Sequence, residues 1–257
     1  MSAHRLRVQR KPFDTLTAAE NAGWARLLRE SATSRWAFLS PTYAEAATIT
    51  LGPVDVLLFW QSDELVGVMP LQRASGWLGR MGMREPVGRH MTDYFGLLAR
   101  PGLQLDWRSL LLKAGVPCLY FTHLDESQSA HGLKGDSPKS GLRTCIHPAG
   151  GEAHREWLRT RDKKLVSDTE RRERKLVTEH GPLLFEMQST SPVLDLESLV
   201  SLKNAQYRRT GHEGGALLDP ANACLLSRLM ASQDTNCQPR LSVLRCGEQV
   251  VAGHFGL

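Results

Sequence analysis

Two stretches, VLLFWQSDELVGV at Val56–Val68 and LSVLRCGEQVVAG at Leu241–Gly253, share one pattern and decide the fold class. In each, an apolar run meets a short polar break and a second apolar run follows, as in a β-hairpin. Each stretch also comes after two segments with apolar residues at helical spacing. Because both the hairpin and its position are repeated, the sequence indicates a duplicated α/β unit.

Around the first hairpin, the spacing of apolar residues predicts helices alternating with strands. The stretch 77–89 is rich in glycine and is predicted to be a long loop. Such an alternation is typical of a mixed sheet flanked by helices. Helices are expected at 21–30, 41–50 and 106–113, and strands at 54–60, 65–71, 93–98 and 116–122.

A polar segment rich in Gly, Pro and Ser, residues 126–151, is predicted to link a first lobe, 15–125, to a second lobe, 152–257. The second lobe should begin with a charged helix that ends before Gly181-Pro182. Within it, Ser167-x-x-Glu170 resembles a capping box, which indicates two helices meeting near Ser167. Further elements are expected as a strand at 183–187, a helix at 194–209 and a helix starting at Asp219-Pro220.

Composition limits the function classes. Of the 257 residues, 41% are hydrophobic, which is enough for a packed core. No apolar run is long enough to span a membrane, and no apolar segment follows the basic N-terminus as in a secretory signal. The five cysteines and nine histidines lack metal-site spacing and suit reduced thiols, so we expect no metal and a cytoplasmic location. The net charge of +5 suits an anionic partner without choosing one.

Five stretches, taken in order and spacing, resemble a known family. The chain is similar to the tandem GNAT proteins of the FemAB-like group, and in particular to the CelD (or BcsL) type. The resemblance implies an α/β fold with two GNAT-like lobes, each holding a mixed sheet. The stretches are Leu65–Leu71, Asp93–Leu98, the basic Leu165–Leu176, Lys203-x-x-x-Tyr207-Arg208 and Leu241–Leu257.

The resemblance implies transfer of an acyl group from acyl-CoA, for instance acetyl-CoA, to an amine on a small molecule or saccharide. In the Fem branch the donor is aminoacyl-tRNA. In this fold, backbone groups of a strand hold the pantetheine arm, and a loop opening a helix binds the pyrophosphate through its amides. The resemblance places the coenzyme beside the last strand, and the candidate coenzyme-binding residues are Arg171, Arg172, Gly253, His254 and Phe255. For His254, an edge or core position is the alternative.

Three polar residues are candidates for catalysis. Asp93 begins an apolar strand and could orient the acceptor amine, or it could be a turn residue. His212 and Glu213 lie in a glycine-rich loop, where a general base or ordinary loop polarity would explain them equally well. The sequence leaves the acceptor, the acyl group and the oligomeric state open.

The sequence departs from the family pattern at its end. The loop R/Q-x-x-G-x-G/A should follow the strand 249–257, and no residues follow Leu257. We therefore expect a second lobe that is incomplete, weak binding of acetyl-CoA, and possible inactivity. One alternative is a non-catalytic remnant or scaffold. Another is a nucleic-acid-binding module using residues 155–175, although that charged stretch also suits a helix face with internal ion pairs.

Overall fold

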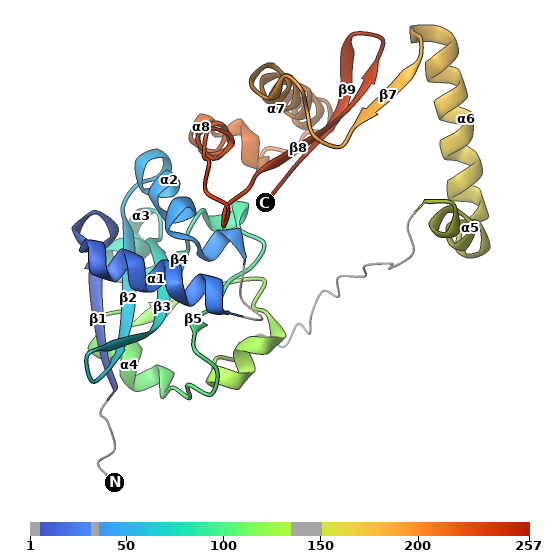
Figure 1. The fold of residues 1–257 in the computed structure, drawn as a ribbon. Coiled ribbons are helices and arrows are strands. Elements are labelled where there is room, and N and C mark those ends of the chain that lie inside the picture. Colours follow the sequence, from blue (N-terminus) through green and yellow to red (C-terminus); the bar gives the residue numbers. More distant parts are fainter. Residues whose placement is uncertain (1–5, 32–35, 135–150) are drawn as a thin grey trace. The chain divides into compact units, whose positions relative to one another are not determined.

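The computed structural model describes residues 6–31, 36–134 and 151–257 (Figure 1). The chain forms two compact units. Unit 1 comprises Met1–Pro138, Lys203–Pro239 and Gly256–Leu257, and unit 2 comprises Lys139–Leu202 and Arg240–Phe255. Among the described helices, none is both long enough and apolar enough to cross a membrane.

Unit 1 is built on a six-stranded mixed sheet. Its main path runs β1-β2-β3-β4-β6, with β5 paired to β3. All pairs are antiparallel except β4 and β6, which are parallel. The mixed sheet with its helices is consistent with a GNAT-like fold. The strands are β1 Leu6–Pro12, β2 Val54–Gln61, β3 Glu64–Arg73, β4 Met83–Pro86, β5 Leu98–Ala99 and β6 Cys118–Leu119.

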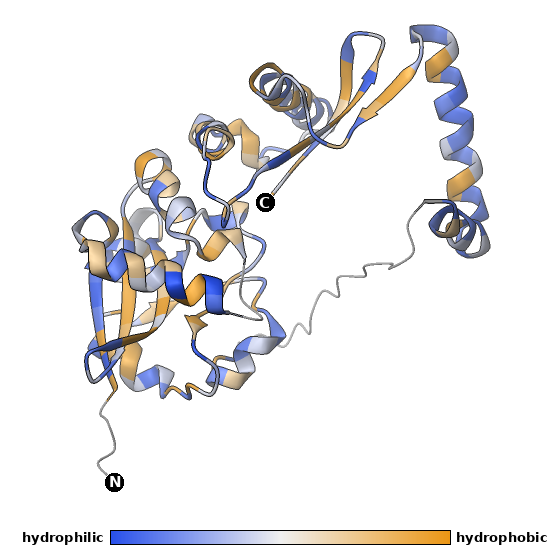
Figure 2. Ribbon diagram, in the orientation of Figure 1, coloured by the Kyte–Doolittle hydropathy of each residue, from blue (hydrophilic) through white to orange (hydrophobic). Residues whose placement is uncertain are grey.

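The first hairpin and its helices confirm the sequence predictions. In α1 (Ala18–Glu30), Thr17 and Glu20 form a reciprocal capping box, and Ser40 caps α2 (Pro41–Leu51). Asp106 caps α4 (Trp107–Lys113). Figure 2 shows hydrophobic residues concentrated along β2 and β3, and these strands supply much of the core together with α4. Core side chains include Leu57, Phe59, Val66, Met69, Leu97, Trp107 and Val116.

Strand β1 was not predicted from the sequence. It pairs with β2 along its whole length, from Leu6 opposite Gln61 to Pro12 opposite Asp55. Leu6 and Val8 pack against the core, while Arg7 between them lies over the Trp60 ring at 5.6 Å. The basic residues of the strand made this period-2 pattern hard to recognise in the sequence.

The prediction of a long loop at 77–89 is wrong. The stretch contains α3 (Gly76–Arg80), β4 and the 3-10 helix η3 (Arg89–Met91). Gly76 and Gly82 have φ values of 65° and 94°, which glycine adopts more readily than other residues. These two glycines therefore allow the chain to turn at either end of α3. A Cβ on Gly79 would lie 1.9 Å from the Ala74 carbonyl oxygen, so this glycine permits a close backbone approach.

Two predicted strands are much shorter than expected. In place of the strand expected at 93–98, only Leu98–Ala99 forms a strand. In place of the strand expected at 116–122, only Cys118–Leu119 does. The segment between β6 and the undescribed residues holds the 3-10 helix η4 (Glu126–His131), whose Gln128 binds the backbone of Leu97 in unit 1. The rest of the predicted linker, from 135 to 150, lies outside the described residues.

Unit 2 contains a three-stranded sheet in the order β7-β8-β9. The predicted charged helix is two helices, but the junction lies at Asp162, which accepts a hydrogen bond from the Leu165 N–H at 2.9 Å. The capping box at Ser167 is wrong, since Ser167 Oγ instead donates to the Lys164 carbonyl. The elements are α5 Gly151–Arg161, α6 Lys163–His180, β7 Leu183–Glu186, α7 Pro192–Thr210, β8 Arg240–Cys246 and β9 Gln249–Gly256.

The elements follow the same order in both halves of the chain. A strand, two helices and a hairpin occur as β1-α1-α2-β2-β3 and again as β7-α7-α8-β8-β9. Helix α8 (Pro220–Met230) is capped by Asp219 as predicted, and it packs against α2 within unit 1. In each sheet the first strand pairs antiparallel with the first strand of the hairpin. The repeated hairpins therefore follow the same elements in sequence, and the first strand of each has an equivalent neighbour in its own sheet. The 3-10 helices η1, η2 and η5 span Phe13–Thr15, Ala37–Leu39 and Ala216–Leu218.

Candidate functional site

In unit 2, helix α7 lies against the hairpin formed by β8 and β9. A Cβ added to Gly253 of β9 would lie 3.3 Å from Leu199 Cδ1 and 3.4 Å from the Ser242 carbonyl oxygen. These distances leave little room for a side chain. The glycine therefore allows the last strand to approach the helix closely.

A partly buried ion-pair network joins the same elements. Arg245 of β8 donates from Nε to Glu186 Oε1 at 2.6 Å and from Nη2 to Asp195 Oδ2 at 2.5 Å. Ser189 Oγ donates to the same Asp195 oxygen at 2.5 Å. The hydrogen bond from Arg245, followed by that from the Thr190 N–H, lowers the pKa of Glu186. The network fixes the start of α7 against β7 and β8.

A groove of about 760 Å³ opens between α7 and the turn of this hairpin. Its lining is rich in hydroxyl and carboxylate groups, including Ser198, Glu197 and Glu248. Such groups accept hydrogen bonds from ammonium and hydroxyl groups of a ligand. The groove thus suits a polar or cationic small molecule better than an apolar one.

Strand β9 forms one side of the described three-stranded sheet. In the order β7-β8-β9 it has β8 on one side, and no other described strand pairs with its outer side. The backbone N–H and C=O groups along that side are the kind that can bind an extended ligand. Of the predicted coenzyme residues, Gly253 and Phe255 on β9 are half-buried and His254 is exposed.

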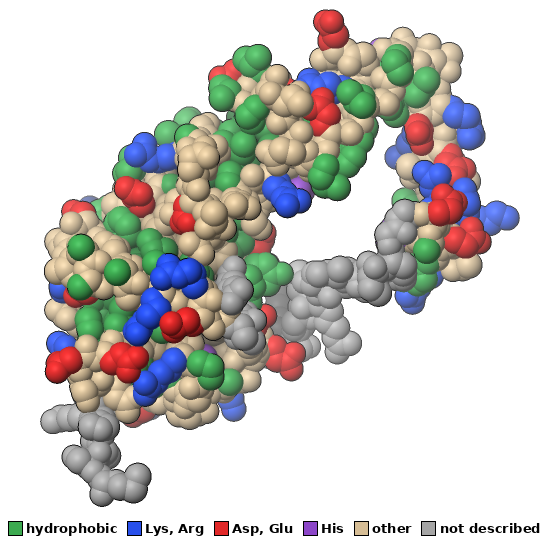
Figure 3. Space-filling view, viewed as in Figure 1, with side chains coloured by type: hydrophobic (Ala, Val, Ile, Leu, Met, Phe, Trp, Pro, Cys, Tyr) green, Lys and Arg blue, Asp and Glu red, His purple; other side chains and the backbone are tan. Residues whose placement is uncertain are grey.

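Arg171 and Arg172 lie in the middle of α6 and are exposed. Arg171 pairs with Asp168 at 3.5 Å. Nearby, Arg159 of α5 binds Glu170 of α6 at 3.1 Å. Figure 3 shows basic and acidic side chains interspersed over α5 and α6. Ion pairs within and between these helices therefore offset much of the positive charge of residues 155–175.

The predicted catalytic residues lie in unit 1. Asp93 is exposed and precedes Tyr94, whose ring stacks on Trp36 with centroids 4.8 Å apart. His212 and Glu213 are exposed in the loop after α7, and the His212 N–H donates to the Tyr207 carbonyl. The structure places these three residues in one unit and the predicted coenzyme residues in the other. Their assignment to catalysis stays a prediction.

Sequence reasoning missed the Arg245 network. Its signal was present, since Arg245 falls two residues after Val243 and four after Leu241, which are both buried on β8. A charged residue in phase with buried apolar residues of a strand points to the covered face and needs a partner there.

It also missed a separation of two parallel strands in unit 1. The pairing of β4 with β6 covers only two residue pairs, and the Tyr120 N–H then donates to the Arg84 carbonyl at 2.9 Å. The next bridge joins Phe95 to Leu124, so residues 87–94, which follow β4, leave the sheet in between. Glu85 of β4 pairs with Arg89 of this segment at 3.0 Å, and burial raises the pKa of the Glu85 carboxyl.

Among the described residues, no group of three or more His, Cys, Asp or Glu side chains is placed to hold a metal ion. A comparison with protein families matches residues 163–257 to the model described as an acetyltransferase (GNAT) domain. The match starts with α6 and includes β7, α7, α8, β8 and β9. Domains of this type transfer an acyl group from acyl-CoA, typically acetyl-CoA, to an acceptor. No curated protein and no solved structure matches the chain.

Proposed function

We propose that the chain is a GNAT-type N-acyltransferase that moves an acyl group from acyl-CoA to an amine on a small molecule or saccharide. The observation that carries the proposal is the family match over 163–257, whose segment folds as a strand, two helices and a hairpin. An amine attacking a thioester needs positioning and stabilisation of the oxyanion more than covalent catalysis. A rigid strand with accessible backbone groups can provide both.

In this proposal the pantetheine arm lies along β9. Backbone groups near Gly253, His254 and Phe255 bind its amides, and the packing of Gly253 on Leu199 holds that strand rigid. Arg171 and Arg172 on exposed α6 attract the coenzyme phosphates.

The groove beside α7 supports an amine acceptor. Its hydroxyl and carboxylate lining, with Ser198, Glu197 and Glu248, matches the hydroxyl and ammonium groups of an amino sugar or a small amine. Asp93, His212 and Glu213 of unit 1 stay sequence-based candidates for orienting or deprotonating an amine, and no contact between them and this groove is proposed.

We also propose that the chain is a tandem protein of the FemAB-like, CelD-type group. The repeated order of a strand, two helices and a hairpin supports two related lobes. In a crystal structure, the hairpins of residues 54–71 and 241–257 should superpose once the helices before them are aligned. Hairpins that point in different directions after that alignment would rule out the duplication.

A second position for the coenzyme is favoured by one observation. The parallel strands β4 and β6 of unit 1 pair for only two residues before they separate. Two strands that separate in this way expose the same kind of backbone groups, and the glycine-rich stretch 76–88 includes β4. The two positions lie in different units, so one experiment can distinguish them.

The test is calorimetric titration of the 257-residue chain with acetyl-CoA, followed by hydrogen exchange. Micromolar binding with slowed exchange in 249–256 supports the site on β9. Micromolar binding with slowed exchange in 83–86 and 118–119 instead moves the coenzyme to unit 1. A titration without binding contradicts the acyl-CoA proposal for this chain and favours a non-catalytic member of the group.

A further inference from the structure

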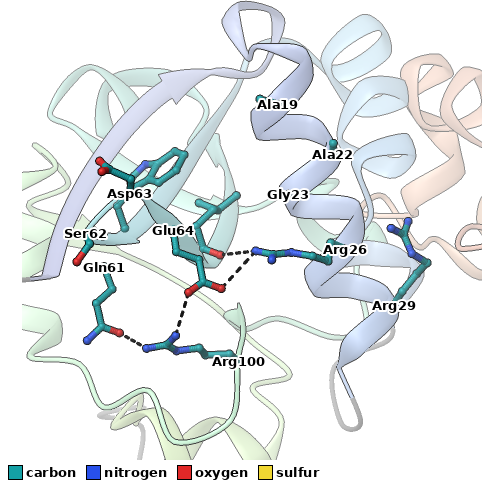
Figure 4. Close-up of a pocket in the computed structure, with 12 residues that line it drawn as sticks. Ala19, Ala22, Gly23, Arg26, Arg29, Gln61, Ser62, Asp63, Glu64 and Arg100 are labelled. Atoms are coloured by element: carbon teal, nitrogen blue, oxygen red, sulfur yellow. Dashed lines mark hydrogen bonds and ion pairs between the residues drawn. The ribbon is translucent and has the colours of Figure 1, made fainter. Parts of the chain in front are cut away.

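A second groove, of about 920 Å³, lies in unit 1 between α1 and the turn of the β2–β3 hairpin (Figure 4). Helix α1 contributes Arg26 and Arg29, and Arg100 follows β5. The hairpin contributes Trp60 near the end of β2 and Glu64 at the start of β3, among others. No residue of the proposed acyltransferase site belongs to this groove.

Two arginines hold a carboxylate in this groove. Glu64 Oε1 lies 3.7 Å from Arg26 Nη2, and Glu64 Oε2 lies 3.4 Å from Arg100 Nη1. Figure 4 shows Glu64 between the two guanidinium groups, which come from opposite sides of the groove. Arg26 also donates to the Leu65 carbonyl at 3.3 Å, and Arg100 donates to Gln61 Oε1. The position between the arginines therefore already accommodates an anion.

Further donors in the groove lack acceptors. Arg26 Nε and the indole Nε1 of Trp60 are both buried, and neither has a hydrogen-bond partner among the described residues. A buried donor without an acceptor is unfavourable. The side chains that line this groove therefore hold more hydrogen-bond donors than acceptors around the pair of guanidinium groups.

The groove beside α7 in unit 2 is a comparison that separates the contribution of the backbone to the groove from that of its side chains. Both grooves lie between the first helix of the repeated motif and the turn of its hairpin. The groove in unit 2 has one arginine, Arg245, and three carboxylates. The groove in unit 1 has three arginines and two carboxylates. Backbone geometry explains that both grooves exist, but the cationic lining is particular to unit 1.

We propose that the groove of unit 1 binds a small molecule through a phosphate group, which takes the place of the Glu64 carboxylate between Arg26 and Arg100. A phosphate monoester carries more charge than a carboxylate and has three acceptor oxygens. Two of these oxygens match the guanidinium groups of Arg26 and Arg100. Because Glu64 competes with the ligand for the two arginines, it lowers the affinity of the groove for phosphate.

The experiment is a titration of the full chain with inorganic phosphate, monitored by calorimetry. Arg26→Gln and Arg100→Gln should each weaken binding by about tenfold, the lower end of what a charge-assisted hydrogen bond contributes. Glu64→Gln should tighten binding, because it removes the competing charge. Arg108 is exposed on α4, outside the groove. Arg108→Gln removes the same charge there and should leave phosphate binding unchanged.

A parallel titration with phenyl phosphate distinguishes free phosphate from an organic ester. Tighter binding of phenyl phosphate identifies an ester whose organic part contacts the groove, and equal binding identifies free phosphate as the ligand. The proposal is overturned if neither compound binds saturably, if Glu64→Gln weakens binding, or if Arg108→Gln weakens it as much as Arg100→Gln. Melting curves of all variants confirm that each is folded.

Discussion

Arg245 of β8 binds Asp195 of α7 through a contact of 2.5 Å between Nη2 and Oδ2. The same guanidinium binds Glu186 of β7 through Nε. One side chain therefore joins a strand, the helix that follows it, and the first strand of the hairpin. The network therefore holds β7, α7 and β8 together, and β8 is the strand on which β9, the proposed coenzyme strand, pairs. We assign the network a structural role and no catalytic one.

Replacing Arg245 tests this structural role. Arg245→Gln leaves two carboxylates close together, with Asp195 buried and without its cation, so the melting temperature should fall clearly. Arg240→Gln is the matched control, since Arg240 is exposed at the start of the same strand. Thermal melts of both variants provide the measurement. Equal melting temperatures for the two would show that the Arg245 pairs contribute nothing beyond surface charge.

The same network predicts how stability changes in acid. The pKa of Glu186 is lowered in the folded chain, mainly by the hydrogen bond from Arg245. The unfolded chain therefore takes up this proton first, and the Glu186 contribution is lost as the pH falls below about 4.3. Urea unfolding at pH 7 and at several pH values between 5 and 3 should show a shallower decline for Glu186→Gln than for the parent. Parallel curves would contradict the lowered pKa.

How much the sequence reveals depends on whether an element carries its own signal. The helices around the first hairpin were predictable because apolar spacing agrees with local caps such as Thr17 and Ser40. Strand β1 was not, because its stability comes from pairing with β2, and its alternating basic residues resemble a solvated N-terminus. The stretch 77–89 misled because its glycines serve close approach and helix ends, which a sequence pattern cannot distinguish from flexibility.

The candidate site was less predictable than the fold. The resemblance pointed to β9 and α6 by their order along the chain, but the partners of Arg245 are 50 and 59 residues away in sequence. The cationic groove of unit 1 combines α1, a hairpin turn and Arg100, three segments that no local motif connects. A cluster of charged residues from such distant segments can be recognised only once the fold has brought the segments together.

The basic residues of α6 allow a prediction that separates binding from folding. Arg171→Gln and Arg172→Gln should change the free energy of unfolding by no more than about 0.5 kcal/mol, because both side chains are exposed. If they attract the coenzyme, each should weaken acetyl-CoA binding, more so at low salt. Denaturant unfolding and calorimetry on the same samples test both parts. A large loss of stability would instead place these arginines in a structural ion-pair network.

Thiol labelling provides an independent check on the described cysteines. Cys118 and Cys224 are exposed, while Cys237 and Cys246 are buried. Burial raises the pKa of the Cys237 thiol to about 11, so its reactive thiolate is scarce at pH 8. Iodoacetamide followed by peptide mass spectrometry should label Cys118 and Cys224 quickly and Cys237 only after denaturation. Rapid labelling of Cys237 in the native chain would contradict the packing around it.

The close approach of β9 to α7 leads to the prediction that bears most directly on function. Gly253→Leu places a side chain where even a Cβ lies 3.3 Å from Leu199, so it should destabilise the chain by about 1–3 kcal/mol through overpacking. The matched control is Ala252→Leu, because Ala252 is exposed on the same strand. If β9 holds the pantetheine arm, Gly253→Leu should also displace the strand and weaken acetyl-CoA binding at temperatures where the variant remains folded. Urea unfolding gives the stability change, and calorimetry gives the affinity. A Gly253→Leu chain that is as stable as Ala252→Leu would show that β9 does not pack on α7, and the rigid coenzyme strand proposed for unit 2 would have to be abandoned.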